Sequence, residues 1–151
     1  MLDFKDEAAA SPGYEEDFVV WLDAQAEFLR AGRLELLDRE NLIDELTSMA
    51  SRYRHEMQSR MEVVLTHLLK CQFQPDHKTR SWLSTLLEQR HEIERLMASS
   101  PGLRHVVTDK MEHCYQHARR MAATETGLSL AQFPLHSPYT VEQMLDQDFL
   151  P

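Results

Sequence analysis

Polar and charged side chains interrupt the apolar pattern in the middle of this chain, where they could pair with one another or bind a ligand. Arg60 occupies a position in an apolar stripe, and Glu56 and His67 lie at its edge. Gln89 occupies a position in the next stripe, and Arg90 lies beside it. Burying such groups without partners costs about 1–3 kcal/mol each, and more for charges. We therefore expect Glu56 to pair with Arg90 or Arg60, and His67 with Gln89, or the whole set to line a groove.

Three interpretations of these polar residues are open. They could form a structural network that sets the register of the helices, which is the ordinary outcome for buried polar groups. They could instead form a site for a ligand or a partner. A catalytic site would need a nucleophile, a base and a group that orients the base, and the sequence shows no such set in a suitable order.

Two histidines further along the chain could bind a metal ion. His113 and His117 are four residues apart, so both imidazoles share one helix face. A closed site would need two more ligands from another helix. Lys110 and Arg120 accompany these histidines on the flank of the apolar stripe, which favours a solvated surface. We expect neither a metal nor another cofactor.

Basic residues are moderately concentrated between residues 47 and 87, where six Lys or Arg stand against three Asp or Glu. This excess falls short of the basic stripe of a nucleic-acid-binding protein, and no recognition helix or glycine-rich phosphate loop accompanies it. Trp21 and Trp82 are interpreted as core anchors rather than platforms for stacked bases. The sequence therefore argues against nucleic acid as a partner. The basic residues are Arg52, Arg54, Arg60, Lys70, Lys78 and Arg80.

Long amphipathic helices must position these side chains. Apolar residues recur at spacings of three and four over 14–31, 38–73 and 79–98, and proline after serine predicts that a fourth helix begins at Ser100-Pro101. Gly127 is expected to end it. The helix over 38–73 would be about 50 Å long at 1.5 Å per residue, which suggests that part of it packs against a partner chain or the C-terminal tail.

Two capping boxes predict short helices in the C-terminal tail. Ser129 with Gln132, and Thr140 with Gln143, each combine an N-cap hydroxyl with an amide side chain three residues later. We predict an all-α protein, an antiparallel bundle of four main helices with a long second helix, plus the two short C-terminal helices. The turn Gln74–His77 would fold the second helix back on the third.

The length and composition of the chain are those of one folded domain. We expect a disordered acidic lead over 1–12 and a single helical domain over 13–151 that includes the docked tail. Residues 1–17 carry a net charge of −5 and residues 125–151 carry −4, while the stretch between them holds 15 residues of each sign. The overall charge of −9 is therefore a poor guide to partners.

No segment suits a membrane. The longest wholly apolar run, Phe18 to Leu22, is far below the ~20 residues of a spanning helix. The acidic N-terminus also lacks the apolar region of a signal peptide. Cys71 and Cys114 lie in helical segments without CxxC spacing, so we expect two buried free thiols in a reducing compartment. These features predict a cytoplasmic protein.

Several motifs follow one another in a fixed order along the chain. They are Tyr14-Glu15-Glu16-Asp17-Phe18 with Trp21, Leu29-Arg30-Ala31-Gly32-Arg33-Leu34, His67-Leu68-Leu69-Lys70 with Gln74-Pro75, Arg80-Ser81-Trp82, Glu88-Gln89-Arg90, Ser99-Ser100-Pro101, Glu125-Thr126-Gly127-Leu128 and Asp148-Phe149-Leu150-Pro151. This set resembles the bacterial family called domain of unknown function 29, over nearly the whole chain from Tyr14. The resemblance implies a compact all-helical bacterial protein of the cytoplasm and no established activity.

The resemblance also points to recurrent polar positions, several of which coincide with the polar residues of the central helices. These positions are His67, Lys70, Gln74, Arg80, Trp82, Glu88, Gln89 and Arg90.

The main hypothesis is a non-enzymatic protein-interaction or self-associating module with a groove on the second and third helices. The over-long second helix and eight adaptable methionines motivate it. The alternative is a ligand- or metal-binding helical-bundle enzyme with a polar site around His67, Glu56 and Arg90. A weaker alternative is a nucleic-acid-associated or antitoxin-like protein. The candidate groove residues are Glu56, Arg60, His67, Lys70, Gln74, Arg80, Trp82, Glu88, Gln89 and Arg90, and the expected partner is a second copy or another protein.

Overall fold

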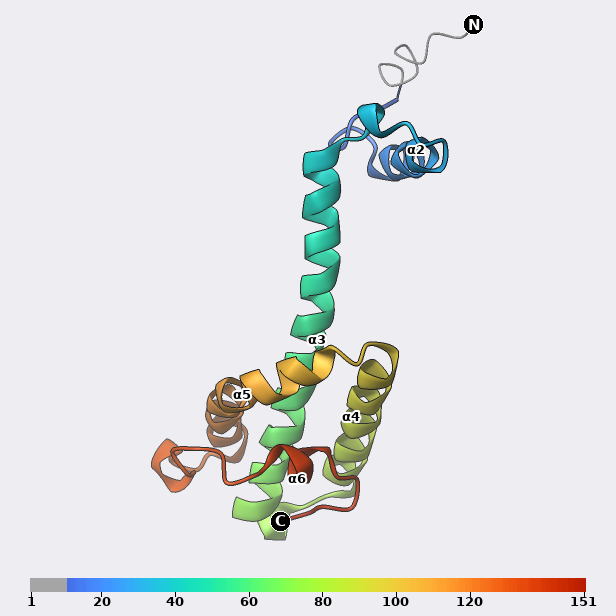
Figure 1. The fold of residues 1–151 in the computed structure, drawn as a ribbon. Coiled ribbons are helices and arrows are strands. Elements are labelled where there is room, and N and C mark those ends of the chain that lie inside the picture. The colour runs from blue at the N-terminus through green and yellow to red at the C-terminus, as the bar shows by residue number, and fades with distance from the viewer. Residues whose placement is uncertain (1–10) are drawn as a thin grey trace, which may run out of the picture. The chain divides into compact units, whose positions relative to one another are not determined.

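The computed structural model describes residues 11–151, and these residues form helices and connecting loops with no strand (Figure 1). The predicted all-α class is therefore confirmed, with four long helices and two short ones in the tail. The chain divides into two compact units, one ending at Ser51 and the other formed by Arg52–Pro151. The predicted disordered lead over 1–12 falls almost wholly outside the described residues.

The N-terminal unit contains helix α2 (Phe18–Arg30), the short helix η1 (Leu34–Leu36) and the first part of α3 (Arg39–Phe73). The α2 helix begins later than the predicted residue 14, because Asp17 accepts a hydrogen bond from Val20 N (3.1 Å) and so caps the helix.

Trp21 and Asp38 join the two helices of this unit. Trp21 Nε1 donates to Asp38 Oδ2 (3.1 Å), and Asp38 N donates to Gln25 Oε1 (2.8 Å). Asn41 Nδ2 also donates to Asp38 Oδ2 (2.8 Å), and its hydrogen bond is the main cause that lowers the pKa of Asp38. Tyr14 packs edge-on against the Trp21 ring, with centroids 4.9 Å apart. Trp21 and Gln25 are the only buried residues of 11–51.

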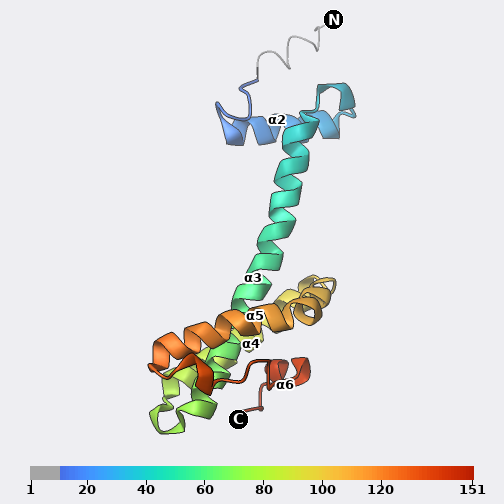
Figure 2. The same ribbon diagram turned by 90° about the vertical axis from the view of Figure 1, so that its left-hand side faces the viewer.

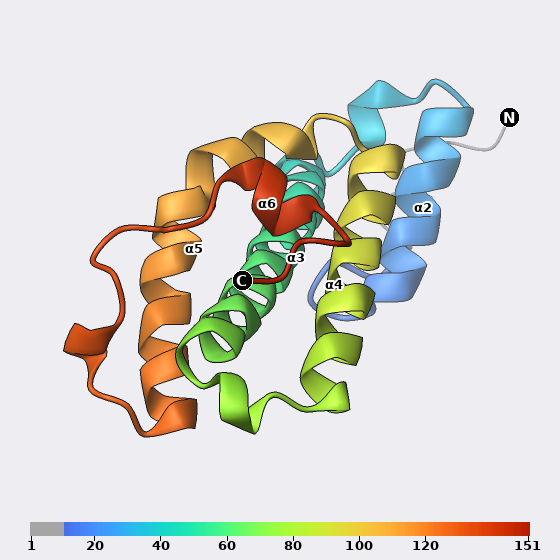
Figure 3. The same ribbon diagram turned by 90° about the horizontal axis from the view of Figure 1, so that it is seen from below.

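The second unit is built on a helical hairpin, as predicted. The last part of α3 is followed by the turn η2 (Pro75–His77) and by α4 (Arg80–Ser99). Thr79 caps α4 by accepting a hydrogen bond from Trp82 N (3.3 Å). Seen from below, α4 and α5 lie on two sides of this part of α3, and α6 lies between them (Figure 3).

Helix α5 (Leu103–Thr126) begins two residues later than predicted, with Gly102 as its N-cap. Ser100 instead ends α4, because its N–H donates to Leu96 O (2.9 Å). The predicted end of α5 is confirmed, since Gly127 adopts the left-handed conformation (φ 73°) that glycine favours at this position.

The C-terminal tail forms η3 (Leu130–Gln132) and α6 (Val141–Leu145). The capping box of Thr140 and Gln143 is complete, as predicted. Ser129 accepts a hydrogen bond from Ala131 N instead of entering a full box, and a single 3₁₀ turn results. The tail runs along α5 (Figure 2). Its end lies beside α4, because Arg90 of that helix donates to Phe149 O.

One hydrophobic core fills the second unit, and it draws on α3, α4, α5 and the tail. The apolar stripe of α3 is buried only from Met57 onward, while Leu46, Met49 and Tyr53 of the same predicted stripe are exposed. No helix among residues 11–151 is both long enough and apolar enough to cross a membrane. Fully buried core residues include Met57, Met61, Val64, Leu65, Leu68, Leu69, Ile93, Val107, Tyr115, Ala118 and Met144.

Candidate functional site

Arg60 is the centre of one polar group between α3 and α4. Its Nε and Nη2 donate to Glu56 Oε1 (3.1 and 2.8 Å), and its Nη1 donates to Gln89 Oε1 (3.1 Å). The pairing of Glu56 with Arg60, one of the two expected, is therefore confirmed. The group links adjacent helices and fixes their register, which is the structural interpretation of these residues.

Lys70 forms a second polar group at the end of α5. Its Nζ lies 2.7 Å from Glu125 Oε2 and 4.4 Å from the centroid of the Trp82 ring, and the side chain is 9% exposed. Gln74 Nε2 donates to Thr126 O (3.2 Å), one of the carbonyls that the end of the helix leaves without a partner. The structure thus brings together three predicted residues, Lys70, Gln74 and Trp82.

Glu125 was not among the predicted site residues, although the sequence carries a signal for it. A carboxylate in the last turn of a helix faces the negative end of the helix dipole, which is unfavourable without a nearby cation. Glu125 lies two residues before the helix-ending Gly127. That position indicated a basic partner, and Lys70 is that partner.

His67 belongs to a different face of α3 from the one expected. Its Nδ1 is 2.9 Å from Val63 O, while Gln89 bonds Arg60, so the predicted pairing of His67 with Gln89 is wrong. His67 instead borders a cavity of about 210 Å³ between α3 and α5. Two further ionisable groups of this cavity, Glu62 and His117, approach to 3.7 Å. Burial is the main cause that lowers the pKa of His67.

The lowered pKa predicts how stability depends on pH. The unfolded chain takes up a proton at His67 near the ordinary pKa, about 6.5, before the folded protein does. Stability should therefore fall as the pH decreases below that value. His67→Asn keeps an amide donor near the Nδ1 position but cannot titrate. We expect a smaller fall in melting temperature between pH 7.5 and 5.5 for this variant.

Exposed His91 on α4 provides the control. His91→Asn should leave the pH dependence of the melting temperature as it is in the parent protein. An equal flattening by both substitutions, or none by His67→Asn, would assign the acid sensitivity to other groups.

Arg90 holds the C-terminal tail. It is 3% exposed, and its guanidinium donates to Met144 O from Nε (2.8 Å), to Phe149 O from Nη1 (2.9 Å) and to Gln143 O from Nη2 (3.1 Å). Burial lowers the pKa of Arg90, and the charge of Asp146 partly offsets this effect. The alternative pairing of Arg90 with Glu56 is wrong, because each guanidinium nitrogen of Arg90 donates to a carbonyl of the tail and Glu56 pairs with Arg60.

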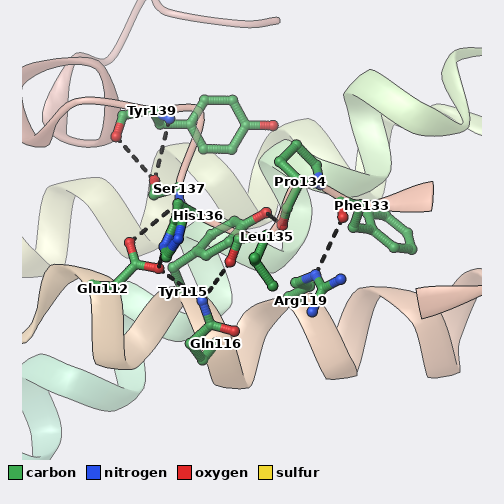
Figure 4. A network of polar contacts seen from close by, with 10 residues as sticks. All are labelled: Glu112, Tyr115, Gln116, Arg119, Phe133, Pro134, Leu135, His136, Ser137 and Tyr139. Carbon is green, nitrogen blue, oxygen red and sulfur yellow. Dashed lines mark hydrogen bonds and ion pairs between the residues drawn. The ribbon is translucent and has the colours of Figure 1, made fainter. Parts of the chain in front are cut away.

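A second set of contacts fixes the tail along α5 (Figure 4). Tyr115 Oη donates to Pro134 O (2.6 Å), and Arg119 Nε donates to Phe133 O (3.3 Å). Glu112 accepts from Ser137 N (3.2 Å). Burial opposes ionisation of Glu112, but hydrogen bonds that include this one lower its pKa. The side chains of α5 thus satisfy backbone groups of a segment without regular structure.

The other predicted residues stand apart from these groups. Arg80 and Glu88 are exposed. His113 is also exposed, and His117 lies beside the cavity with Glu62 rather than with His113. Among residues 11–151, no cluster of three or more His, Cys, Asp or Glu side chains could hold a metal ion.

Both cysteines are buried free thiols, as expected. Cys114 Sγ donates weakly to Gln58 O (3.7 Å), and burial raises its pKa to about 12. Burial also raises the pKa of Cys71. Thiolates are the nucleophilic form of cysteine, so neither side chain is prepared for covalent chemistry in the folded protein.

Two exposed apolar stripes of the N-terminal unit were not among the predicted site residues. Phe18, Leu22 and Leu29 share a face of α2, which we call the α2 stripe, and are 42%, 38% and 53% exposed. Ile43, Leu46 and Met49 of α3, the α3 stripe, are 57%, 65% and 47% exposed. The sequence had shown the apolar periodicity of both helices, but not which of their apolar residues the core would leave uncovered.

Fold and contacts together define an all-helical protein that combines a well-packed C-terminal unit with an N-terminal unit rich in exposed apolar residues. No curated protein and no solved structure is significantly similar to the chain. The family model described as Domain of unknown function DUF29 matches residues 14–150, and the chain belongs to this family. The resemblance inferred from its motifs is therefore confirmed.

Proposed function

We propose that this chain is a protein-interaction module and that its N-terminal unit carries the binding surface. The exposed α2 and α3 stripes are the observation on which the proposal rests. Among residues 11–51 only Trp21 and Gln25 are buried, and such a segment gains stability when a partner removes its exposed apolar side chains from water.

The contacts of the polar residues argue against the predicted groove on the second and third helices. Arg60, Lys70 and Arg90 are all engaged by other parts of the fold. Every buried side-chain nitrogen or oxygen among the described residues has a hydrogen-bond partner. These side chains serve the fold of residues 52–151, which leaves the exposed apolar stripes as the surface that a partner could use.

Site-specific crosslinking in cells would test this proposal. A photoreactive amino acid at Leu46 should give crosslinked products, because this side chain belongs to the α3 stripe. The same amino acid at Leu87, which is 60% exposed on α4, is the matched control and should give few products. Mass spectrometry of the products would identify the partner, or a second copy of this chain. Equal yields at both positions, together with a strict monomer in light scattering, would refute the proposal.

A further inference from the structure

The net negative charge of this protein arises from its N-terminal unit. The sequence up to Ser51 holds 13 acidic and four basic residues, a formal charge of −9, which equals that of the whole chain. Residues 52–151 hold 12 of each sign and are neutral. The unit that exposes the apolar stripes is therefore also the acidic unit.

Charge and apolar surface meet on α3. Glu40 and Asp44 are exposed and four residues apart, so they share the flank of the helix next to Ile43. Ile43, Leu46 and Met49 follow at spacings of three along the neighbouring face. The α3 stripe is thus an exposed apolar ridge with carboxylates on one side, and α2 adds exposed Asp23 and Glu27 to the same unit.

We infer that the N-terminal unit binds a basic amphipathic helical segment of another protein. This inference rests on the proposed function and specifies its partner. Leucine-like side chains of such a segment would cover the α3 stripe, while its Lys or Arg residues would face Glu40 and Asp44. A helix that lays its apolar face on a hydrophobic surface is a common mode of recognition, and complementary charge supplies its specificity.

Charge also argues against a second copy of the chain, nucleic acid and anionic lipid as the partner of this surface. Two copies joined through this unit would bring together two units that each carry a formal charge of −9, and like charges across an interface are unfavourable. The phosphates of nucleic acid and of anionic lipid would meet the same repulsion. A basic polypeptide is the class of partner whose charge and apolar face both fit.

Binding of designed peptides to the full chain would test the inference. The first probe is a fluorescent amphipathic helix of leucine and lysine, and the second keeps the leucine pattern but replaces lysine with glutamate. A third peptide of lysine and serine has the charge without an apolar face. We expect the leucine–lysine peptide alone to bind well, and its affinity to fall as salt rises from 50 to about 300 mM, because added ions screen surface charges.

Matched variants would locate the binding site. Ile43→Ser combined with Leu46→Ser should weaken binding by roughly tenfold or more, since central apolar side chains carry much of the energy of an interface. Leu87→Ser combined with Leu135→Ser removes leucines that are 60% and 65% exposed from residues 52–151, and should have little effect. Glu40→Gln with Asp44→Asn should reduce the salt dependence, whereas Glu88→Gln with Glu94→Gln on α4 should not. Circular dichroism would verify that each variant is folded.

The outcomes separate this inference from the proposed function. Equal binding of the lysine and glutamate peptides, sensitive to the Ile43 and Leu46 substitutions, would overturn the basic partner and leave the interaction surface intact. A dimer that the Ile43 and Leu46 substitutions dissociate would also overturn the basic partner, and it would show that the surface binds a second copy of this chain. If the lysine–serine peptide bound as tightly as the leucine–lysine peptide, charge alone would explain the binding, and the inference would be overturned. Absence of any peptide binding in a monomeric protein would overturn both.

Discussion

Replacement of Arg90 with alanine is expected to release the C-terminal tail and to destabilise the second unit by about 3–5 kcal/mol. The guanidinium donates to three tail carbonyls and is itself almost completely buried. Without it, these carbonyls lose their partners, and α6 no longer holds Met144 in the core. Urea unfolding would measure the loss of stability. Hydrogen exchange should show faster exchange throughout Val141–Leu145.

Arg95 on the same helix is the matched control for this substitution. It is exposed and forms an ion pair with Glu92 at 2.9 Å, an arrangement that contributes about 0–1 kcal/mol. Arg95→Ala should therefore change stability little. Arg90→Lys retains the positive charge, but an ammonium group cannot donate to all three carbonyls in the geometry of the guanidinium. We therefore expect Arg90→Lys to lose about as much stability as Arg90→Ala. Full stability of Arg90→Lys would show that charge, and not the geometry of the guanidinium, holds the tail.

Replacement of Trp21 with alanine should disrupt the N-terminal unit and leave the other unit folded. Trp21 is 2% exposed, donates a hydrogen bond to Asp38 and contacts the rings of Tyr14 and Phe18. Removing a buried tryptophan costs about 3–5 kcal/mol, and no other apolar side chain among residues 11–51 is buried to compensate. We expect the amides of α2 to exchange rapidly in a hydrogen-exchange experiment.

The same experiment contains its own comparison, because the amides of α5 should remain protected in the Trp21→Ala protein. Val19 lies on the same helix and is 64% exposed, so Val19→Ala should stay within about 0.5 kcal/mol of the parent. Parallel loss of protection in α2 and α5 would contradict the separation of the chain into two units.

Local signals in the sequence were sufficient to predict the helices. Apolar periodicity, the turn at Pro75, the stop at Gly127 and the Thr140 capping box each depend on residues close together in the chain. The start of α5 was misplaced because Ser100-Pro101 fits two roles. A serine before a proline can begin a helix, but here Ser100 closes the preceding one.

The pairings of the site depend on distant residues, and here prediction was only partly successful. Glu56 and Arg60 are one helical turn apart, and their contact was one of the two alternatives predicted for Glu56. Arg90 and Phe149 are 59 residues apart, and no periodic pattern specifies which carbonyls a buried guanidinium will find. His67 was misassigned because a shift of a single residue around a helix turns a side chain by about 100°, from α4 toward α5.

The two cysteines can report on local opening of the folded protein. Both thiols lie in residues 52–151 and are shielded from water, so a disulfide reagent in solution can reach them only when the surrounding helices part. Their rate of labelling therefore measures how often this half of the chain opens. Since the sequence before Arg52 contains no cysteine, the labelling reports on residues 52–151 alone.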